Sequence, residues 1–369
     1  MTGASASTPS PMSRLLERFD AGQRPALARA ITVVENQRPG FQELLHRVVS
    51  RGLRARRVGL TGPPGAGKSS LVADLAARFR TTDEDVGIVA VDPTSPYSGG
   101  ALLGDRIRMN DLATDSGIFI RSMATRGSLG GLATTTREVI DLMDAFGLPR
   151  LLIETVGVGQ TELEITGAAD SVVVVLVPES GDAIQAMKAG LMEIADVFVV
   201  NKADRPGADR LVKEISLAIH LRAGEALRDI PAHHGVDLAT VGAKEPRTPR
   251  RYERARPEAG EWKIPVFKTV AQTGEGVDEL TRALDEHRVY LESSGELERR
   301  RRERTASRIR DVVNREVSRV VWRSGETSSL LSEGLDAITT GAETAYSVAR
   351  RIVERHLGTV DTELPAENP

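Results

Sequence analysis

The chain has 369 residues, a formal net charge of −3 and no cysteine. Its length exceeds that of one ordinary compact core, so we expect a main domain with appendages. The balanced charge offers no overall attraction to nucleic acid or to an anionic membrane, and the lack of cysteine excludes disulfides, thiolate nucleophiles and cysteine-based metal sites.

No segment has the properties of a secretory signal or a membrane span. Residues 1–20 contain no apolar region of roughly 7–15 residues, as a signal peptide would. No stretch approaches the roughly 18 consecutive apolar residues that a spanning helix needs. We therefore expect a cytoplasmic protein that binds neither membrane nor nucleic acid.

Two or three helices are predicted at the start of the chain. Apolar side chains recur at helical spacing over residues 12–51, and Pro25 and the Arg-Pro-Gly break at 38–40 separate them into segments. We assign residues 1–52 to an N-terminal helical extension.

Short apolar segments alternate with helical patterns from residue 57 onward. Several of them, such as the valine run at 172–177, are apolar on both faces, which is typical of parallel strands covered by helices on both sides. The predicted fold is therefore α/β, a doubly wound and mainly parallel sheet, over residues 53–290. The predicted strands are 58–60, 86–91, 118–120, 151–153, 172–177, 197–200 and 266–269.

Residues 291–369 are predicted to form a C-terminal helical arm and tail. An Arg/Glu-rich segment at 296–310 leads into an apolar stripe at helical spacing. The stripe could dock on a partner subunit or pack back on its own domain, and we place docking on a partner only slightly ahead. The stripe consists of Ile309, Val312, Val313, Val317, Val320 and Val321.

A glycine-rich loop joins the first predicted strand to a helix that begins near Ser70. It matches the phosphate-binding pattern GxxxxGK[ST], whose backbone N–H groups and helix N-terminus attract phosphate. Lys68 is expected to reach the β- and γ-phosphates, and the Ser69 hydroxyl to bind Mg²⁺. The predicted nucleotide-binding residues of this segment are Gly62, Pro63, Pro64, Gly65, Ala66, Gly67, Lys68, Ser69 and Ser70.

Two later loops are candidates for recognising the base. Asn201, Lys202 and Asp204 form an NKxD pattern directly after the strand at 197–200. An aspartate there accepts hydrogen bonds from N1–H and the 2-amino group of guanine, which adenine cannot offer, while the lysine stem packs along the base. Thr269, Val270 and Ala271 follow the next strand, and the Ala271 N–H would meet guanine O6. We therefore expect GTP or GDP, with ATP as the disfavoured alternative.

Three carboxylates are candidates for the metal side of the site. Asp92 and Glu154 each end a predicted strand, where an acid holds Mg²⁺ directly or through water. Asp105 is a third candidate, although a lone aspartate in a loop is as often a cap or a surface charge.

An ExxG pattern begins at Glu154. Gly157 can offer its N–H to the γ-phosphate, but Val158 stands where a water-orienting glutamine would be expected, and Gln160 is two residues farther on. We therefore hypothesise that GTP hydrolysis is slow until a partner protein completes the site.

The full set of motifs resembles the MeaB/ArgK branch of the G3E-type GTPases. The segments that carry the resemblance are GPPGAGKSSL, VAVDPTSPYSGGALLGDRIRM, FIRSMATRGSLGGLA, IETVGVGQTE and NKAD, within about residues 12–330. The resemblance implies a homodimer formed through the C-terminal arm. It also implies a GTP-hydrolysing chaperone that associates with an adenosylcobalamin-dependent acyl-CoA mutase such as methylmalonyl-CoA mutase, gates cofactor loading, and protects or rescues the mutase.

Residues 178–188 match an additional switch segment of that family. Asp182 and Lys188 could form an ion pair there that responds to the nucleotide, or could belong to a solvated loop. Pro96 and Tyr97 depart from the small polar residues typical of the family, so the acyl-CoA substrate of the partner mutase stays open.

Two other functions remain as alternatives. A kinase linked to lysine, arginine and ornithine transport would need a second substrate pocket, which the sequence does not indicate. A nickel-inserting GTPase would need Cys or His ligands, and the adjacent pair His233 and His234 lies in a loop-like segment.

Overall fold

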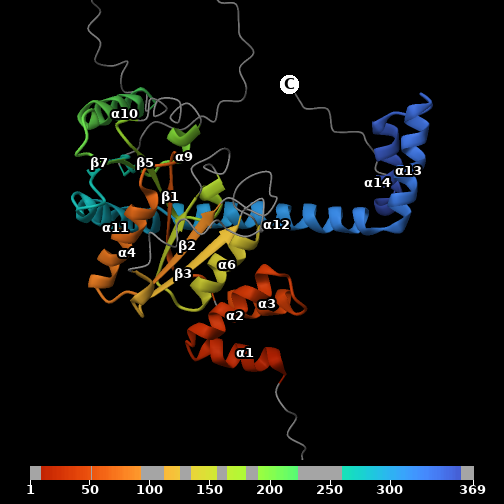
Figure 1. Cartoon of the computed structure of the whole chain (residues 1–369), viewed down its shortest axis with the longest axis horizontal. Helices are drawn as coiled ribbons and strands as arrows, with labels where there is room; N and C mark the ends of the chain where they lie inside the picture. The colour runs from red at the N-terminus through yellow and green to blue at the C-terminus, as the bar shows by residue number, and fades with distance from the viewer. Residues whose placement is uncertain are drawn as a thin grey trace, which may run out of the picture. The chain divides into compact units, whose positions relative to one another are not determined.

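The computed structural model describes residues 10–50, 52–92, 112–124, 134–155, 164–179, 190–222 and 260–358. The chain divides into two compact units, Met1–Arg304 and Thr305–Pro369. The first unit contains a central sheet with its surrounding helices, and the described residues of the second, up to residue 358, form helices and their connections (Figure 1).

A parallel sheet forms the centre of the first unit. In the described residues seven strands lie in the order β3-β2-β4-β1-β5-β6-β7, and every neighbouring pair is parallel. Each of the seven predicted strands is present, so the predicted fold class is confirmed. The strands are β1 (Arg56–Thr61), β2 (Val86–Asp92), β3 (Ile118–Ala124), β4 (Arg150–Glu154), β5 (Ser171–Leu176), β6 (Val197–Asn201) and β7 (Val266–Thr269).

Successive side chains of the central strands enter opposite hydrophobic cores. In β5, Val172 and Val174 belong to one core, whereas Val173 and Val175 belong to the other. This alternation explains why the strands are apolar at every position, since both faces of the sheet are covered. Each valine removed from water in this way contributes roughly 1.5–3 kcal/mol before entropy is counted.

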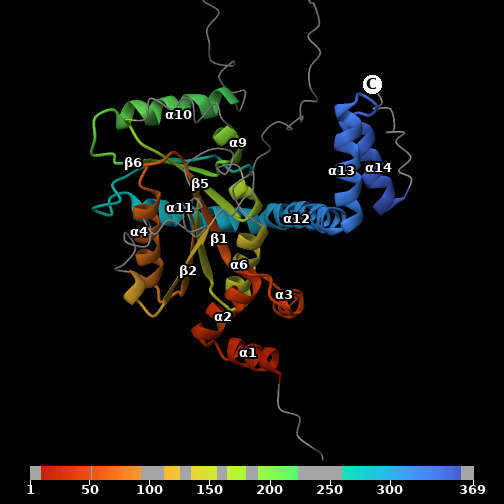
Figure 2. The same ribbon diagram turned by 45° about the vertical axis from the view of Figure 1, so that its right-hand side comes forward.

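Helices cover both faces of the sheet. α4 (Lys68–Thr81) and α11 (Val277–Ser293) pack on one face, while α6 (Thr134–Ala145) and α10 (Ala208–Arg222) pack on the other. Figure 2 shows α4 and α6 on opposite sides of β1 and β2. The shorter helical segments of this unit are η1 (Leu112–Thr114), η2 (Ile165–Gly167) and α9 (Met192–Ile194).

Three N-terminal helices extend the core on the α6 face, as predicted. They are α1 (Pro11–Asp20), α2 (Arg24–Glu35) and α3 (Phe41–Val49). Leu27 and Ile31 of α2 are fully buried in the same core as α6, and Phe19 of α1 meets Phe146 edge to face with the ring centroids 5.1 Å apart.

A buried ion-pair network occupies the amino-terminal ends of β5 and β6. Asp170, directly before β5, accepts hydrogen bonds from Arg288 of α11 and from Arg301 and Arg304 of α12 (Glu296–Arg323). Burial raises the pKa of the Asp170 carboxyl, but the guanidinium groups outweigh it and hold this pKa at about 2. The carboxylate therefore stays charged, and the first turns of α12 are attached to the sheet.

A second carboxylate, that of Asp196, lies directly before β6, as Asp170 lies directly before β5. Asp196 accepts two hydrogen bonds from Arg300 at 2.9 Å each, and it also accepts a hydrogen bond from the backbone N–H of Val172.

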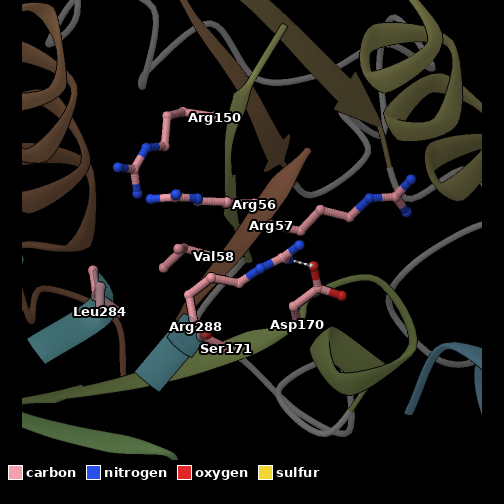
Figure 3. A pocket seen from close by; sticks show the side chains of 8 residues that line it. All are labelled: Arg56, Arg57, Val58, Arg150, Asp170, Ser171, Leu284 and Arg288. Carbon is pink, nitrogen blue, oxygen red and sulfur yellow. Dashed lines mark hydrogen bonds and ion pairs between the residues drawn. The ribbon is translucent and has the colours of Figure 1, made fainter. Parts of the chain in front are cut away.

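Asp170 lines a small pocket at the same edge of the sheet together with Arg56, Arg57, Val58, Arg150, Ser171, Leu284 and Arg288 (Figure 3). Figure 3 shows the Arg288 guanidinium directed at the Asp170 carboxylate.

A fully buried histidine joins this network. His287 of α11 contacts the Ser171 hydroxyl through Nδ1 at 2.8 Å, and its Nε2 lies 3.5 Å from an Asp196 oxygen. Burial lowers the pKa of the imidazole to about 4, with Arg300 acting in the same direction and Asp196 against it. His287 is therefore neutral at physiological pH.

The second unit is a small helical cluster. The end of α12, α13 (Gly325–Thr339) and α14 (Ala345–Leu357) share a core of Val321, Val348 and Ile352. Gly334 allows close packing of α13 on α14, because a Cβ there would lie 2.4 Å from the Val348 side chain. Among the described residues, no helix combines the length and apolar content that a membrane crossing requires.

The predicted apolar stripe on α12 is solvent-exposed within the second unit. Ile309 is 59% exposed, and Val313, Val317 and Val320 are also exposed, whereas Val321 is buried in the local core. The positions are spaced by four, four and three residues, so they lie on one side of the helix.

His287 should make the stability of the protein depend on pH. Its unfolded pKa is about 6.5, and its folded pKa is about 4, so between these values the unfolded chain binds a proton that the folded chain does not. The free energy of unfolding should therefore fall as the pH is lowered through this window, by roughly 3 kcal/mol from this residue. Urea denaturation of wild type and His287→Gln at pH 4.5–7 measures the difference.

The control for this experiment is His220→Gln on the exposed side of α10. That variant should keep the wild-type pH dependence. An equally steep decline in the His287→Gln protein would contradict the assignment.

Candidate functional site

The predicted phosphate loop lies between β1 and α4, at the carboxyl-terminal edge of the sheet. Gly62, Gly65 and Gly67 have φ angles of 137°, 75° and 83°, which only glycine adopts without strain. A Cβ at Gly62 would lie 2.0 Å from the Val175 carbonyl oxygen, so the loop can pass this close to β5 only with glycine there.

Lys68 is the first residue of α4 and curls back over the loop. Its Nζ donates to the carbonyl oxygens of Gly62 at 2.9 Å and Pro63 at 3.1 Å. Lys68 is only 7% exposed, so its charge is held inside the loop beside the helix N-terminus. Both features create positive potential where a phosphate would lie.

Ser69 and Glu154 come together from different elements. β1 and β4 are neighbours in register, with Leu60 opposite Glu154, so the end of β4 lies beside the start of the loop. The Ser69 hydroxyl donates to Glu154 Oε1 at 2.7 Å, and both residues are buried. A hydroxyl and a carboxylate oxygen are thus adjacent at the metal position that the sequence predicts.

Two threonines that were not singled out in the sequence connect the same strand ends. Thr155 donates its hydroxyl to Thr61 Oγ1 at 3.1 Å, and its backbone N–H bonds the Leu60 carbonyl at 3.2 Å. The sequence signal is the position of each, since Thr61 directly precedes the loop and Thr155 directly follows Glu154. The pair fixes the start of the loop relative to the acidic residue.

Asn201 links the phosphate loop to the predicted base-recognition loop. Its amide nitrogen donates to the Ala66 carbonyl at 2.9 Å, and its Oδ1 accepts from Thr269 Oγ1 at 3.1 Å and the Ala271 N–H at 3.2 Å. The missing Cβ of Gly67 makes room for this amide, because an added Cβ would lie 2.4 Å from Nδ2. The structure thus brings together residues that are far apart in the chain.

The remaining base-side residues follow Asn201. Lys202 has a positive φ of 55°, a conformation that is uncommon outside glycine and reverses the chain at this point. Ala203 donates its N–H to the Thr269 carbonyl at 3.0 Å, which aligns the two loops. Asp204 is exposed at the surface. The Ala271 N–H, expected to meet guanine O6, is engaged with Asn201 in this structure.

Several predicted site residues lie outside the described part of the chain. Asp92 ends β2 as expected, but the structure does not describe its side chain. Among the described side chains, no group of three or more His, Cys, Asp or Glu residues gathers as a metal site. The predicted residues that are not described at all are Asp105, Gly157, Gln160, Asp182 and Lys188.

Comparisons with known proteins identify relatives across most of the chain. A family model described as methylmalonyl-CoA mutase-associated GTPase MeaB matches residues 27–326. A putative GTPase of Pyrococcus horikoshii is 43% identical over 351 residues, which are 94% of this chain and 99% of that protein. The mouse mitochondrial methylmalonic aciduria type A homolog is 34% identical over 304 residues, 79% of this chain and 66% of that protein.

A solved structure extends the likeness to the fold. The crystal structure of an LAO/AO transport system kinase aligns with a TM-score of 0.62 and 25% identity, over 95% of this chain and 99% of that one.

The family match and the site agree with each other. The matched region, 27–326, contains the loop from Gly62 to Ser69, Glu154 and the NKxD segment. The resemblance inferred from the motifs is thereby confirmed, as is the prediction of a GTP-hydrolysing enzyme. The chain belongs to the MeaB family of methylmalonyl-CoA mutase-associated GTPases.

Proposed function

We propose that the loop after β1 holds the phosphates of GTP with Mg²⁺ and that this site drives a chaperone cycle on a coenzyme-B12-dependent mutase. The observation that carries the site is the contact of Ser69 with Glu154, beside a buried Lys68 at a helix N-terminus. Lys68 exchanges its bonds to loop carbonyls for bonds to the β- and γ-phosphate oxygens. The charge of the lysine and the backbone N–H groups then stabilise the negative charge that develops during phosphoryl transfer.

The residues beside the loop fit a magnesium ion. Octahedral Mg²⁺ with oxygens at about 2.0–2.1 Å holds neighbouring ligands roughly 2.9 Å apart. The Ser69 and Glu154 oxygens are 2.7 Å apart, close to that spacing. Bound there, Mg²⁺ would neutralise phosphate charge, with Ser69 as a direct ligand and Glu154 holding it directly or through water. Asp92 and Asp105 are proposed as further carboxylates on the metal side.

Guanine specificity is proposed for the loops joined by Asn201. Asp204 accepts hydrogen bonds from N1–H and the 2-amino group, Lys202 packs along the base, and the Ala271 N–H bonds O6. The hydrogen bond from the Ala271 N–H to Asn201 at 3.2 Å supports this proposal, because it brings the two loops together. Gly157 and Gln160 are proposed to serve the γ-phosphate and the attacking water.

Substituting Lys68 tests the phosphate role. In Lys68→Ala, GTP hydrolysis should fall at least about 100-fold, since one preorganised charge at the transition state is typically worth that much. The chain should still fold, because the β-sheet core does not depend on this side chain. Steady-state phosphate release and the melting temperature are the measurements.

Lys213→Ala, an exposed lysine on α10, is the matched control and should behave as wild type. Unimpaired hydrolysis in Lys68→Ala would remove the loop from the reaction.

We further propose that the partner is an adenosylcobalamin-dependent acyl-CoA mutase of the methylmalonyl-CoA mutase type. GTP binding and hydrolysis would gate cofactor loading and protect or reactivate the mutase. The family description names that association, and the mouse relative is named for methylmalonic aciduria. Residues 178–188, with Asp182 and Lys188, are the proposed segment that signals to the mutase. A cytoplasmic location is part of the same proposal.

Calorimetric titration tests the partner. The protein should bind the mutase of its own organism with an affinity that differs at least several-fold between a non-hydrolysable GTP analogue and GDP. Lys68→Ala should lose that nucleotide dependence. If none of the organism's acyl-CoA mutases binds while hydrolysis is intact, the chaperone role is wrong.

The alternative functions predict different products. The aligned structure is that of an LAO/AO transport system kinase, so a transport-linked kinase is the first alternative. Such a kinase would transfer labelled γ-phosphate to a protein or an amino acid. A nickel-inserting GTPase would bind nickel stoichiometrically. Release of all the label as free phosphate, without nickel binding, favours the mutase chaperone.

A homodimer through the arm is proposed from the exposed stripe on α12. Four aliphatic side chains on one side of a helix are costly to leave in water, and the described part of the second unit does not cover them. Light scattering at micromolar concentration should give twice the chain mass. The double substitution Val313→Glu and Val317→Glu should give the mass of one chain.

The matched control for the dimer is Val289→Glu, an exposed valine on α11 of the first unit. It should leave the mass unchanged. A wild-type protein with the mass of one chain would refute the dimer.

A further inference from the structure

The loop that follows β7 is tightly built. The Val270 carbonyl accepts the N–H groups of Thr273 and Gly274 at 3.0 Å each, and the Val270 N–H bonds the Glu275 carbonyl at 3.0 Å. Gly276, at φ 76°, closes the loop because a Cβ there would lie 2.0 Å from the Lys268 carbonyl oxygen. These internal bonds fix the shape of the loop, so contacts from outside the loop fix its position.

Asn201 holds the start of this loop at Ala271, and an arginine contacts it farther on, at Gly274. Arg78 of α4 donates from Nη2 to the Gly274 carbonyl at 3.4 Å, and its Nε lies 3.1 Å from an Asp278 oxygen on α11. A Cβ at Gly274 would lie only 2.7 Å from Nη2, so the guanidinium rests directly on the loop backbone. The Asp74 carboxylate, one turn earlier on α4, interacts electrostatically with Arg78.

The element that carries Arg78 is the helix that begins with the phosphate-binding residues. Lys68 and Ser69 form the first turn of α4, and Arg78 lies in its last turn. A single rigid helix thus contacts the phosphate loop at one end and the base loop at the other. The loop after β7 is thus contacted by Asn201 at Ala271 and by Arg78 at Gly274.

We propose that Arg78 is a positioning residue for guanine recognition, which holds the 270–276 loop so that the Ala271 N–H can pass from Asn201 to O6 of the base. The inference rests on the proposed guanine site. A planar guanidinium suits this role because it reaches a carbonyl and a carboxylate at the same time, which an ammonium group does in a less directed way. Without Arg78 the loop keeps its internal bonds but loses its external alignment on the α4 side.

Nucleotide analogues separate this role from a general loss of structure. In 6-thio-GTP the O6 acceptor is replaced by a poorly accepting sulfur, whereas N1–H and the 2-amino group remain. ITP keeps O6 and N1–H but lacks the 2-amino group that Asp204 would bind. The preference for GTP over 6-thio-GTP therefore reports on Ala271, and the preference for GTP over ITP reports on Asp204.

The test compares kcat and KM for these three nucleotides in wild type and Arg78→Met. The variant should raise KM for GTP about 3–10-fold, the worth of one hydrogen bond, with kcat nearly unchanged. Its preference for GTP over 6-thio-GTP should fall towards one, and its preference for GTP over ITP should stay at the wild-type ratio. Asp278→Asn should act in the same direction, which keeps the test informative if Arg78→Met folds poorly.

Arg282→Met is the matched control, since this exposed arginine of α11 pairs with Glu279 on its own helix. It should leave all ratios at wild-type values. If Arg78→Met and Asp278→Asn keep the wild-type KM and both ratios, the inference about Arg78 is overturned. It is also overturned if both ratios fall together, because that indicates a generally disordered pocket. A wild type that does not distinguish GTP from 6-thio-GTP would instead refute the proposed guanine loop itself.

Discussion

The side-chain amide of Asn201 is the interaction on which the rest of the site depends. One group bonds the phosphate loop through Ala66 and the following loop through Thr269 and Ala271. It can do so because β1, β5, β6 and β7 are parallel neighbours whose carboxyl ends meet at one edge. The amide is buried, so leaving its donor or acceptor unsatisfied would cost about 1–3 kcal/mol and would detach one loop from the other.

The two edges of the sheet hold different chemistry. At the carboxyl edge, glycines, amides and hydroxyls shape loops that can exchange their hydrogen bonds with a nucleotide. At the amino edge, the buried carboxylates of Asp170 and Asp196 pair with arginines of α11 and α12. Such pairs add little net stability, but removing one member leaves a buried charge. The amino edge is therefore a fixed base for the loops at the other edge.

The sheet and the phosphate loop were predictable because their signals are local. A buried parallel strand is apolar at consecutive positions, as 172–177 is, and a phosphate loop is contiguous from Gly62 to Ser69. Contacts such as Arg78 with Gly274, or Arg301 with Asp170, join residues more than a hundred positions apart. The sequence does not indicate which residue an arginine on a helix surface contacts, so these contacts can be identified only once the fold is known. Glu154 was predictable from its place at a strand end, whereas Thr61 and Thr155 look like ordinary strand-end residues.

The arginines of α12 also bear on where this protein could be divided. Arg300, Arg301 and Arg304 lie in the first compact unit, although they belong to a helix that continues to Arg323. A nucleotide-binding fragment that ended before Glu296 would strip Asp170 and Asp196 of most of their counter-ions while leaving both carboxylates in the interior. For chimeras, minimal domains or crystallisation fragments, the natural cut therefore lies after Arg304, inside a continuous helix rather than in a loop.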